Sequence, residues 1–279
     1  MKSLIKSVFF RLLDLLNFRH VESFFHSYLD QKCSVNTPLT ELCSSNANIL
    51  PRLYHQAIPD RYSYNLTVYQ KTTNFLNFED LTKWLRGNDQ NNSRDLARFF
   101  LLNLCIDQLL DEDISGNVAE LGVYKGNSAH LLAKYAKRIN RDCYLFDTFE
   151  GFDKKDLVNR DKTIDPSLFK DTSLETVKSI VGSDNVQYVK GYFPDSLENI
   201  GDLAQFSLVH IDCDLGKPFR HALEYFYPRL VEGGFLILHD YSSLFWPGAT
   251  QAINEFFMDK PEFVVPLPDK SGTCIVRKI

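Results

Sequence analysis

Two apolar runs in the second half of the chain end in side chains that could bind a metal ion or accept a proton. Asp212 and Asp214 follow the run FSLVHI, and His239 and Asp240 follow the run GFLIL. Carboxylates bind divalent cations, and carboxylates and imidazoles act as general bases. If these runs are neighbouring parallel strands, their side chains meet at the carboxyl edge of the sheet, and we predict that they do.

The elements that must position these residues follow a regular alternation from residue 117 onward. Strand-like runs cover 117–122, 143–147, 186–191, 206–212 and 235–240, and helical patterns cover 94–110 (with Ser93 as N-cap), 127–140, 173–182 and 218–234. Strands that alternate with helices predict an α/β fold whose mostly parallel sheet has helices on both faces. The last run, FVVPLPDKSGTCIVRKI, predicts an antiparallel hairpin at the sheet edge.

The loop after the first strand indicates which ligand the sheet edge would bind. A dinucleotide site has the pattern G-x-G-x-x-G, but Tyr124 stands at the middle position between Gly122 and Gly126 and would crowd a pyrophosphate. Glu120 is unfavourable for a phosphate and favourable for an amino group or a sulfonium cation. S-adenosylmethionine has both and carries no phosphate.

A second acidic residue supports an adenosine site. Asp147 ends the second strand, 27 residues after Glu120, where an acid can accept hydrogen bonds from both ribose hydroxyls. The alternative is that Gly122 and Gly126 form an ordinary tight turn and that Asp147 caps the following segment. The full set of residues expected at the cofactor is Glu120, Gly122, Tyr124, Gly126, Ser128, Asp147, Thr148, Gly191, Phe193, Asp195 and Asp212.

Several blocks between residues 114 and 258 resemble one family, in the order and spacing that the family has. They are GNVAELGVYKGNSA, LFDTFEGF, VKGYFPDSL, HIDCDLGKPFRHALEYFYPRLVEGGFLILHDY and WPGATQAINEFF. The chain resembles the S-adenosylmethionine-dependent macrocin O-methyltransferases of the TylF/MycF/NovP type. The resemblance implies a class I methyltransferase (Rossmann-like) fold, methylation of a hydroxyl, typically on a sugar of a natural product or glycan, and a divalent metal, usually Mg²⁺.

The resemblance also implies a metal-binding set, which falls on Asp212, His239 and Asp240. The family usually has Asp where this chain has His239, and Mg²⁺ prefers oxygen ligands, whereas Mn²⁺, iron or zinc tolerate an imidazole better. Alternatively His239 is the catalytic base together with Asp212, or a core histidine bonded to the backbone. Asp214 is a neighbour of the ligands, an alternative ligand or a helix cap.

Composition limits the remaining possibilities. The 279 residues carry a net charge of −5 and six cysteines without a C-x-x-C pair, which is typical of a cytoplasmic protein without nucleic-acid partners. No apolar run is long enough for a membrane span. We expect a helical and irregular N-terminal extension (1–92), whose amphipathic stretch 2–30 could form a homodimer interface, and a methyltransferase domain (93–279).

The residues favour an S-adenosylmethionine-dependent O-methyltransferase that acts, with metal assistance, on a sugar hydroxyl. The charged segment 152–172 is long for a connection between a strand and a helix, and we expect a lid over the acceptor that is mobile without ligand. The alternatives are a catalytically inactive scaffold protein with the same fold, or a nucleotide-dependent oxidoreductase, against which the missing middle glycine argues. The acceptor, a small molecule or a glycan, cannot be identified from the sequence.

Overall fold

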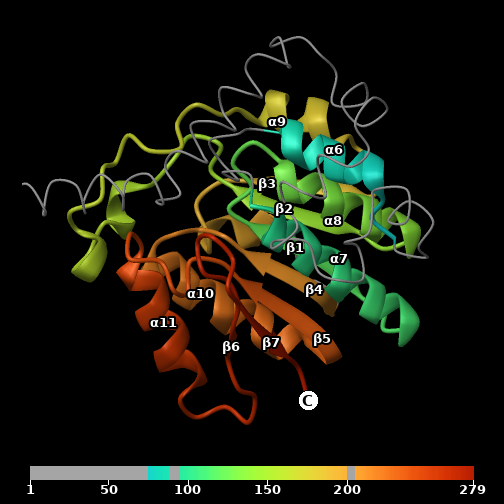
Figure 1. Cartoon of the computed structure of the whole chain (residues 1–279). Coiled ribbons are helices and arrows are strands. Elements are labelled where there is room, and N and C mark those ends of the chain that lie inside the picture. Colours follow the sequence, from blue (N-terminus) through green and yellow to red (C-terminus); the bar gives the residue numbers. More distant parts are fainter. Residues whose placement is uncertain (1–74, 88–94, 200–204) are drawn as a thin grey trace, which may run out of the picture.

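A twisted sheet forms the centre of the molecule in the computed structural model, which describes residues 75–87, 95–199 and 205–279 (Figure 1). Within these residues seven strands pair in the order β3-β2-β1-β4-β5-β7-β6. Their bounds are β1 Asn117–Leu121, β2 Cys143–Asp147, β3 Val186–Lys190, β4 Phe206–Ile211, β5 Leu230–Leu238, β6 Val265–Pro266 and β7 Cys274–Arg277. The first five are parallel, and β7 runs antiparallel to both β5 and β6. The predicted α/β class and the antiparallel C-terminal hairpin are confirmed.

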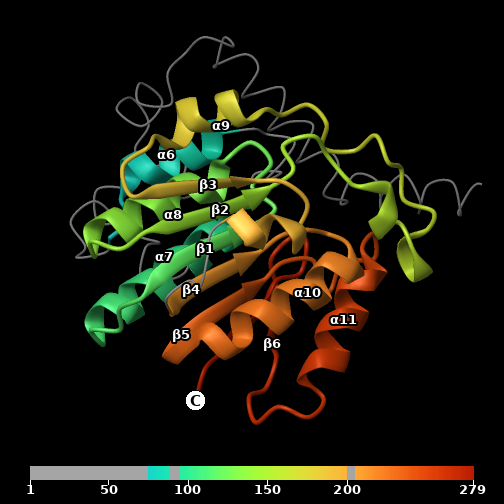
Figure 2. The same cartoon turned by 180° about the vertical axis from the view of Figure 1, so that it is seen from behind.

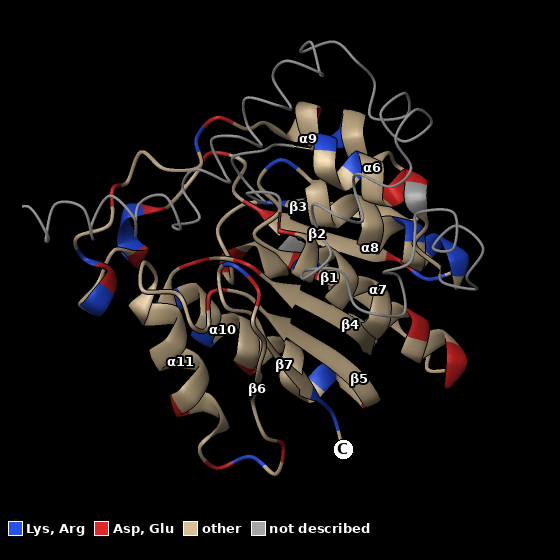
Figure 3. Cartoon of the chain, in the orientation of Figure 1, with Lys and Arg blue, Asp and Glu red and all other residues tan. Residues whose placement is uncertain are grey.

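The strand order reverses between β1 and β4, which places a crevice at their carboxyl ends, where open α/β sheets bind their ligands. β4 is buried along its whole length and carries no charged residue, and acidic residues follow where it ends (Figure 3). Its neighbours β1 and β5 are buried at the same level. The central strands are therefore buried at this level and end in polar residues, as the sequence predicts, although β1 also carries the buried Glu120.

Helices cover the two faces of the sheet and divide the core in two. One core contains residues of α6 (Phe78–Arg86), α7 (Leu96–Asp111), α8 (Asn127–Arg138) and α9 (Leu174–Val181). The other core contains residues of α10 (Gly216–Phe226) and α11 (Pro247–Phe257), which lie in front of the sheet in Figure 2. Among the described residues, no helix combines the length and the apolar content that crossing a bilayer requires.

Two predicted element boundaries are wrong. The N-cap of α7 is Asp95, whose carboxylate accepts the backbone N–H of Arg98; the predicted cap, Ser93, lies outside the described residues. The predicted helix 218–234 ends at Phe226, and after a 3₁₀ turn with Pro228 the chain enters β5 at Leu230, which pairs with β4. Apolar residues that continue from a helix into a buried strand hide such a boundary in the sequence.

The predicted N-terminal extension is described only in part. Its helix α6 begins with a capping box, in which Asn77 accepts backbone N–H groups and Asp80 bonds back to the cap. The α6 residues Leu81 and Trp84 lie in the same core as α7 and α8, so this helix packs as a continuation of the domain. The predicted amphipathic helix 2–30 and its role in a dimer interface lie outside the described residues.

Candidate active site

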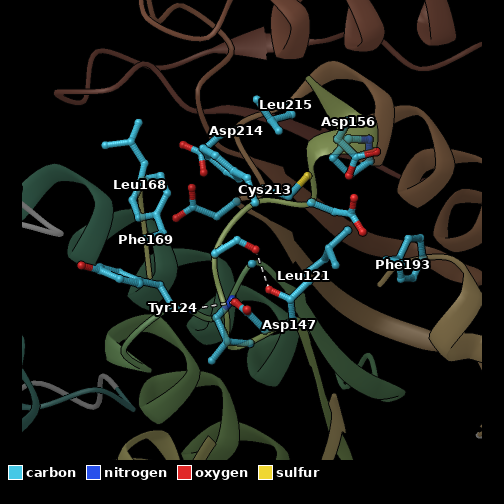
Figure 4. Close-up of a pocket in the computed structure, with 18 of the residues that line it drawn as sticks. Leu121, Tyr124, Asp147, Asp156, Leu168, Phe169, Phe193, Cys213, Asp214 and Leu215 are labelled. Carbon is cyan, nitrogen blue, oxygen red and sulfur yellow. Dashed lines mark hydrogen bonds between the residues drawn. The ribbon is translucent and has the colours of Figure 1, made fainter. Parts of the chain in front are cut away.

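A cavity of about 650 Å³ opens at the carboxyl edge of the sheet (Figure 4). This volume is within the range of about 300–1,000 Å³ that small-molecule sites occupy. In Figure 4, Leu168 and Phe169 lie on one side of the cavity, Phe193 lies on the opposite side, and Asp147 and Asp214 lie between them. The predicted site residues that line it are Gly122, Tyr124, Ser128, Asp147, Thr148, Gly191, Phe193, Asp212, His239 and Asp240.

The ends of the central strands meet in this cavity, as predicted. Backbone pairing continues one residue beyond the strands: Asp212 N donates to Leu121 O at 2.8 Å, and His239 N donates to Ile211 O at 2.9 Å. Gly122 allows this approach, because a Cβ there would lie 1.9 Å from the carbonyl oxygen of Asp212. Its φ of +91° is also a conformation that residues with side chains rarely adopt.

Asp147 organises the first loop. Its Oδ2 accepts the N–H groups of Val123 and Tyr124 at 2.7 and 2.8 Å, and its Oδ1 accepts that of Phe149 at 2.6 Å. Burial raises the pKa of Asp147, although the three amide donors oppose this shift. A carboxylate offers about four lone-pair positions, so Asp147 keeps acceptor capacity beside these amides, and its contact with the ribose hydroxyls stays a prediction.

Three predicted cofactor residues do not line the cavity. Glu120 is wholly buried beneath it and binds the hydroxyl of Ser128 at 2.5 Å and Nδ1 of His210 at 2.7 Å. Gly126 is the N-cap of α8 and turns the chain into the helix with φ +85°. Asp195 is exposed and pairs with Lys155. Glu120 thus reaches the cavity only through Ser128.

His239 lies between two carboxylates. Its Nδ1 is 2.7 Å from Asp212 Oδ1 and 3.0 Å from Asp240 Oδ1, and the donor atoms of the three residues lie within 4.8 Å of one another. Burial lowers the pKa of His239, but the negative charge of Asp212, with that of Asp240, outweighs it and raises the pKa to about 9. Burial alone would raise the pKa of Asp212. The positive charges of His239 and Arg98 outweigh burial and hold this pKa below its usual range. We call Asp212, His239 and Asp240 the acid–histidine cluster.

Asp214 stands beside this cluster and is not a helix cap. The N-cap of α10 is Leu215, whose side chain makes no capping bond. Burial raises the pKa of Asp214 well above its usual range, and the neighbouring carboxylates of Asp240 and Asp212 add to the shift. Asp214 and Asp240 both have positive φ, 61° and 64°, and strained backbone of this kind is concentrated at functional sites.

Two features of the cavity were not predicted from the sequence. Arg98 on α7 lines it, with Nη1 2.8 Å from Asp212 Oδ2. The rings of Phe152, Phe169 and Trp246 form an aromatic wall, with centroids 5.2 to 6.1 Å apart. One signal for Arg98 was present: it is the only basic residue in helix α7, among a run of apolar residues at its N-terminal half. The aromatic wall joins two segments that are far apart in the sequence.

The expected lid, residues 152–172, is fastened at its middle and near its C-terminal end. At the middle Asp161 is 2% exposed, and its carboxylate accepts the N–H groups of Gly216 at 2.8 Å and Gly248 at 3.2 Å, in the first turns of α10 and α11. Near the C-terminal end Asp171 accepts hydrogen bonds from the hydroxyl of Tyr124 and from Nζ of Lys125, both at 2.5 Å. Its mobility without ligand stays a prediction.

Asp161→Ala is expected to release the middle of this segment, because two helix N–H groups then lose their partner and each buried unpaired donor costs about 1–3 kcal/mol. We expect tryptic cleavage at Arg160 and Lys162 to become at least about tenfold faster, as measured by mass spectrometry of timed digests. Asp165→Ala is the matched control, since this carboxylate is exposed in the same segment and bonds only within its own turn. Equal cleavage of Asp161→Ala and the unmodified protein would contradict the anchoring role.

Comparison with known proteins places this chain in a family. A family model described as macrocin-O-methyltransferase (TylF) matches residues 95–275. The mycinamicin III 3''-O-methyltransferase of Micromonospora griseorubida is 28% identical over 179 residues, 58% of this chain and 68% of that protein. The 8-demethyl-8-(2,3-dimethoxy-alpha-L-rhamnosyl)-tetracenomycin-C 4'-O-methyltransferase of Streptomyces olivaceus is 26% identical over 53% of this chain and 61% of that protein.

Solved structures confirm the fold. The O-methyltransferase NovP superposes with a TM-score of 0.56 at 15% identity, covering 86% of this chain and 98% of that chain. The calicheamicin methyltransferase CalS11 superposes with a TM-score of 0.53 at 20% identity, covering 71% and 90%. The predicted class I methyltransferase fold is therefore confirmed, and the family model spans the strands and the cavity residues described above. The chain belongs to the macrocin-O-methyltransferase (TylF) family.

Proposed function

We propose that this protein transfers a methyl group from S-adenosylmethionine to a hydroxyl of a sugar, on a natural product or a glycan. The observation that carries the proposal is the continuity of one cavity from the first loop, with Gly122 and Asp147, to the acid–histidine cluster. Both curated relatives named above are O-methyltransferases, and the name of the tetracenomycin relative includes a rhamnosyl group, which supports the same class of acceptor. Family membership favours methyl transfer over the oxidoreductase alternative.

The cofactor would bind along the ends of β1, β2 and β3. Asp147 keeps an acceptor position for ribose, and Gly191 and Phe193 line the cavity where the third strand ends. Ser128 lines the cavity and donates to the buried Glu120, so the hydroxyl oxygen of Ser128 is left to accept a hydrogen bond from the amino group of the cofactor. Glu120 would then stabilise that positive charge through Ser128 rather than by direct contact.

The acceptor would bind between the aromatic wall and the acid–histidine cluster. Aromatic rings offer flat apolar surfaces against which a sugar ring or an apolar aglycone can pack, and Trp246 lies in the loop between His239 and α11. Holding the two reactants in line supplies much of the rate of a displacement at a sulfonium carbon. The wall and the lid segment would supply this positioning.

The proton of the acceptor hydroxyl would pass to the pair of Asp212 and His239. A sugar hydroxyl is too weak an acid to ionise near pH 7, so a general base is needed as the new bond forms. Asp212 Oδ1 lies 2.7 Å from His239 Nδ1, so the negative charge of Asp212 would stabilise an imidazole that receives the proton. Asp240 Oδ1, 3.0 Å from the same nitrogen, stabilises the charged imidazole.

The acid–histidine cluster also fits a divalent cation. Asp240 Oδ2 and both ring nitrogens of His239 are buried and have no hydrogen-bond partner among the described residues, so these atoms are available as ligands of an ion. Asp212, His239 and Asp240 would hold the ion, and the imidazole suits Mn²⁺ better than the Mg²⁺ implied by the family resemblance. A bound cation would lower the pKa of the acceptor hydroxyl.

Without added metal, the rate of methyl transfer is expected to rise with pH up to about 9, the pKa of His239. Below that value the imidazole is protonated and cannot accept a proton, so the rate should increase about tenfold per pH unit between pH 7 and 8. The measurement is kcat as a function of pH in a chelating buffer, and again with Mn²⁺. A flat profile from pH 7 to 9 in the chelating buffer would contradict the base role of His239.

Calorimetric titration with S-adenosylhomocysteine tests the function directly. Micromolar binding supports the cofactor assignment, and weaker binding after chelation supports a metal at the acid–histidine cluster. Absence of binding in both buffers would favour the inactive scaffold alternative. Methylation is then measured with a panel of glycosides and free sugars, by mass spectrometry for a gain of one methyl group.

A further inference from the structure

Arg98 is fixed in place by its own helix and by a tryptophan. Its backbone N–H donates to the cap residue Asp95, and its guanidinium lies 5.4 Å from the ring centre of Trp84. The indole N–H of Trp84 donates in turn to the carbonyl oxygen of Asp95 at 3.0 Å. The Arg98 side chain is only 5% exposed, so its direction toward the cavity is determined by packing.

The guanidinium nevertheless keeps one buried donor that the described residues leave unpaired. Its Nη1 binds Asp212 Oδ2 at 2.8 Å, whereas its buried Nε has no hydrogen-bond partner among the described residues. An arginine that served only to stabilise the fold would be expected to have its buried donors paired, since an unpaired one is costly. Its placement on the cavity wall instead indicates a role in the site.

Asp212 is thereby held from two sides. Arg98 occupies Oδ2, and His239 Nδ1 faces Oδ1 at 2.7 Å. A divalent cation at the acid–histidine cluster must share Asp212 with a guanidinium that stays charged at any accessible pH. The contact between Arg98 and Asp212 therefore orients the base and also opposes the binding of a cation.

We infer that Arg98 is a positioning residue for methyl transfer, which holds Asp212 so that Oδ1 faces His239, and that it weakens the binding of a divalent cation at this cluster. The first claim, that Arg98 positions Asp212 for methyl transfer, is the catalytic half of the inference and rests on the proposed function. The second claim, that Arg98 weakens cation binding, is the metal-binding half and depends only on the residues of this chain. The two halves predict opposite effects of one substitution, which a general loss of structure does not produce.

Arg98→Met is the main variant, because methionine retains an apolar side chain to pack on Trp84 and removes the charge. We expect it to bind Mn²⁺ at least about tenfold more tightly than the unmodified protein and to have a kcat at least about tenfold lower, with the KM for S-adenosylmethionine changed less than threefold. Mn²⁺ binding is measured on the full chain from the electron paramagnetic resonance signal of the free ion. Arg98→Lys keeps the charge and should restore Mn²⁺ affinity to within about threefold of the unmodified protein.

Arg220→Met is the matched control, since this arginine also pairs with a carboxylate, Glu255, but outside the main cavity. It should leave both Mn²⁺ affinity and kcat unchanged.

Unchanged or weaker Mn²⁺ binding by a folded Arg98→Met protein would overturn the inference. If Arg98→Met does not fold, Arg98→Gln, which also removes the charge, decides: tighter Mn²⁺ binding with a lower kcat supports the inference, and unchanged or weaker Mn²⁺ binding contradicts it. Failure of the unmodified protein to bind S-adenosylhomocysteine would overturn the proposed function and, with it, the catalytic half, while the Mn²⁺ titration still tests the metal-binding half.

Discussion

Asp212→Asn is expected to lower kcat by about a thousandfold, which lies in the range of about 10²–10⁴ that a general base contributes. The substitution preserves the shape of the side chain and the backbone bond to Leu121, but it removes the charge that His239 and Arg98 face. The bound cofactor contacts other residues as well, so affinity for S-adenosylhomocysteine should fall less than about tenfold. Single-turnover methylation and calorimetry separate the two quantities.

Asp184→Asn is the control for this substitution, because this carboxylate is 70% exposed, pairs with Lys137 on the surface and lies outside the cavity. It should reproduce the kinetics of the unmodified protein. The loss of charge also leaves Arg98 without its partner, so the melting temperature of Asp212→Asn must be measured in parallel. A folded Asp212→Asn protein whose kcat is within threefold of the unmodified value would rule out the proposed base pair.

Gly122→Ala is expected to reduce the free energy of unfolding by more than about 4 kcal/mol, the exceptional range for single substitutions. The new Cβ would lie 1.9 Å from Asp212 O, so either β1 or β4 must move where they carry the site. The positive φ contributes only about 1–2 kcal/mol of this loss. Urea denaturation measures stability, and calorimetry with S-adenosylhomocysteine measures whether the loop still binds.

Gly182→Ala isolates the steric contribution. Gly182 has the same φ of +91°, but no atom lies within 4 Å of the position that its Cβ would take. The difference between the two alanine variants therefore reports the clash alone. If Gly122→Ala is no less stable than Gly182→Ala, the close contact between the strand ends does not determine the structure of the site.

The sequence predicted those parts of the site that depend on where parallel strands end. Asp147 ends a strand, and Asp212 and His239 follow buried strands; topology brings such positions together regardless of side-chain detail. Gly122 was predicted as a glycine that lets the backbone approach a ligand, and the structure shows that it also admits the carbonyl oxygen of Asp212. The fold class and the hairpin followed from the alternation of apolar patterns.

The residues that were missed or misplaced depend on side-chain direction, which pattern and spacing do not contain. Glu120 lies on a strand whose alternate residues face opposite sides of the sheet, and its side chain turns toward His210 under α8 instead of into the cavity. Arg98 comes from a helix that precedes the first strand and meets Asp212 across 114 residues. Asp195 was assigned by its distance from a strand end, but a 3₁₀ turn carries it to the surface.

The two anchors of segment 152–172 have a consequence for how new acceptor preferences could arise in evolution or in directed libraries. Between Asp161 and Asp171 most side chains are exposed, and Leu168 and Phe169 line the cavity. Exchanges in this stretch would remodel one wall of the cavity without altering the strand ends. Selection for a different acceptor can therefore act on a short stretch of the chain, while the residues at the strand ends are inherited unchanged.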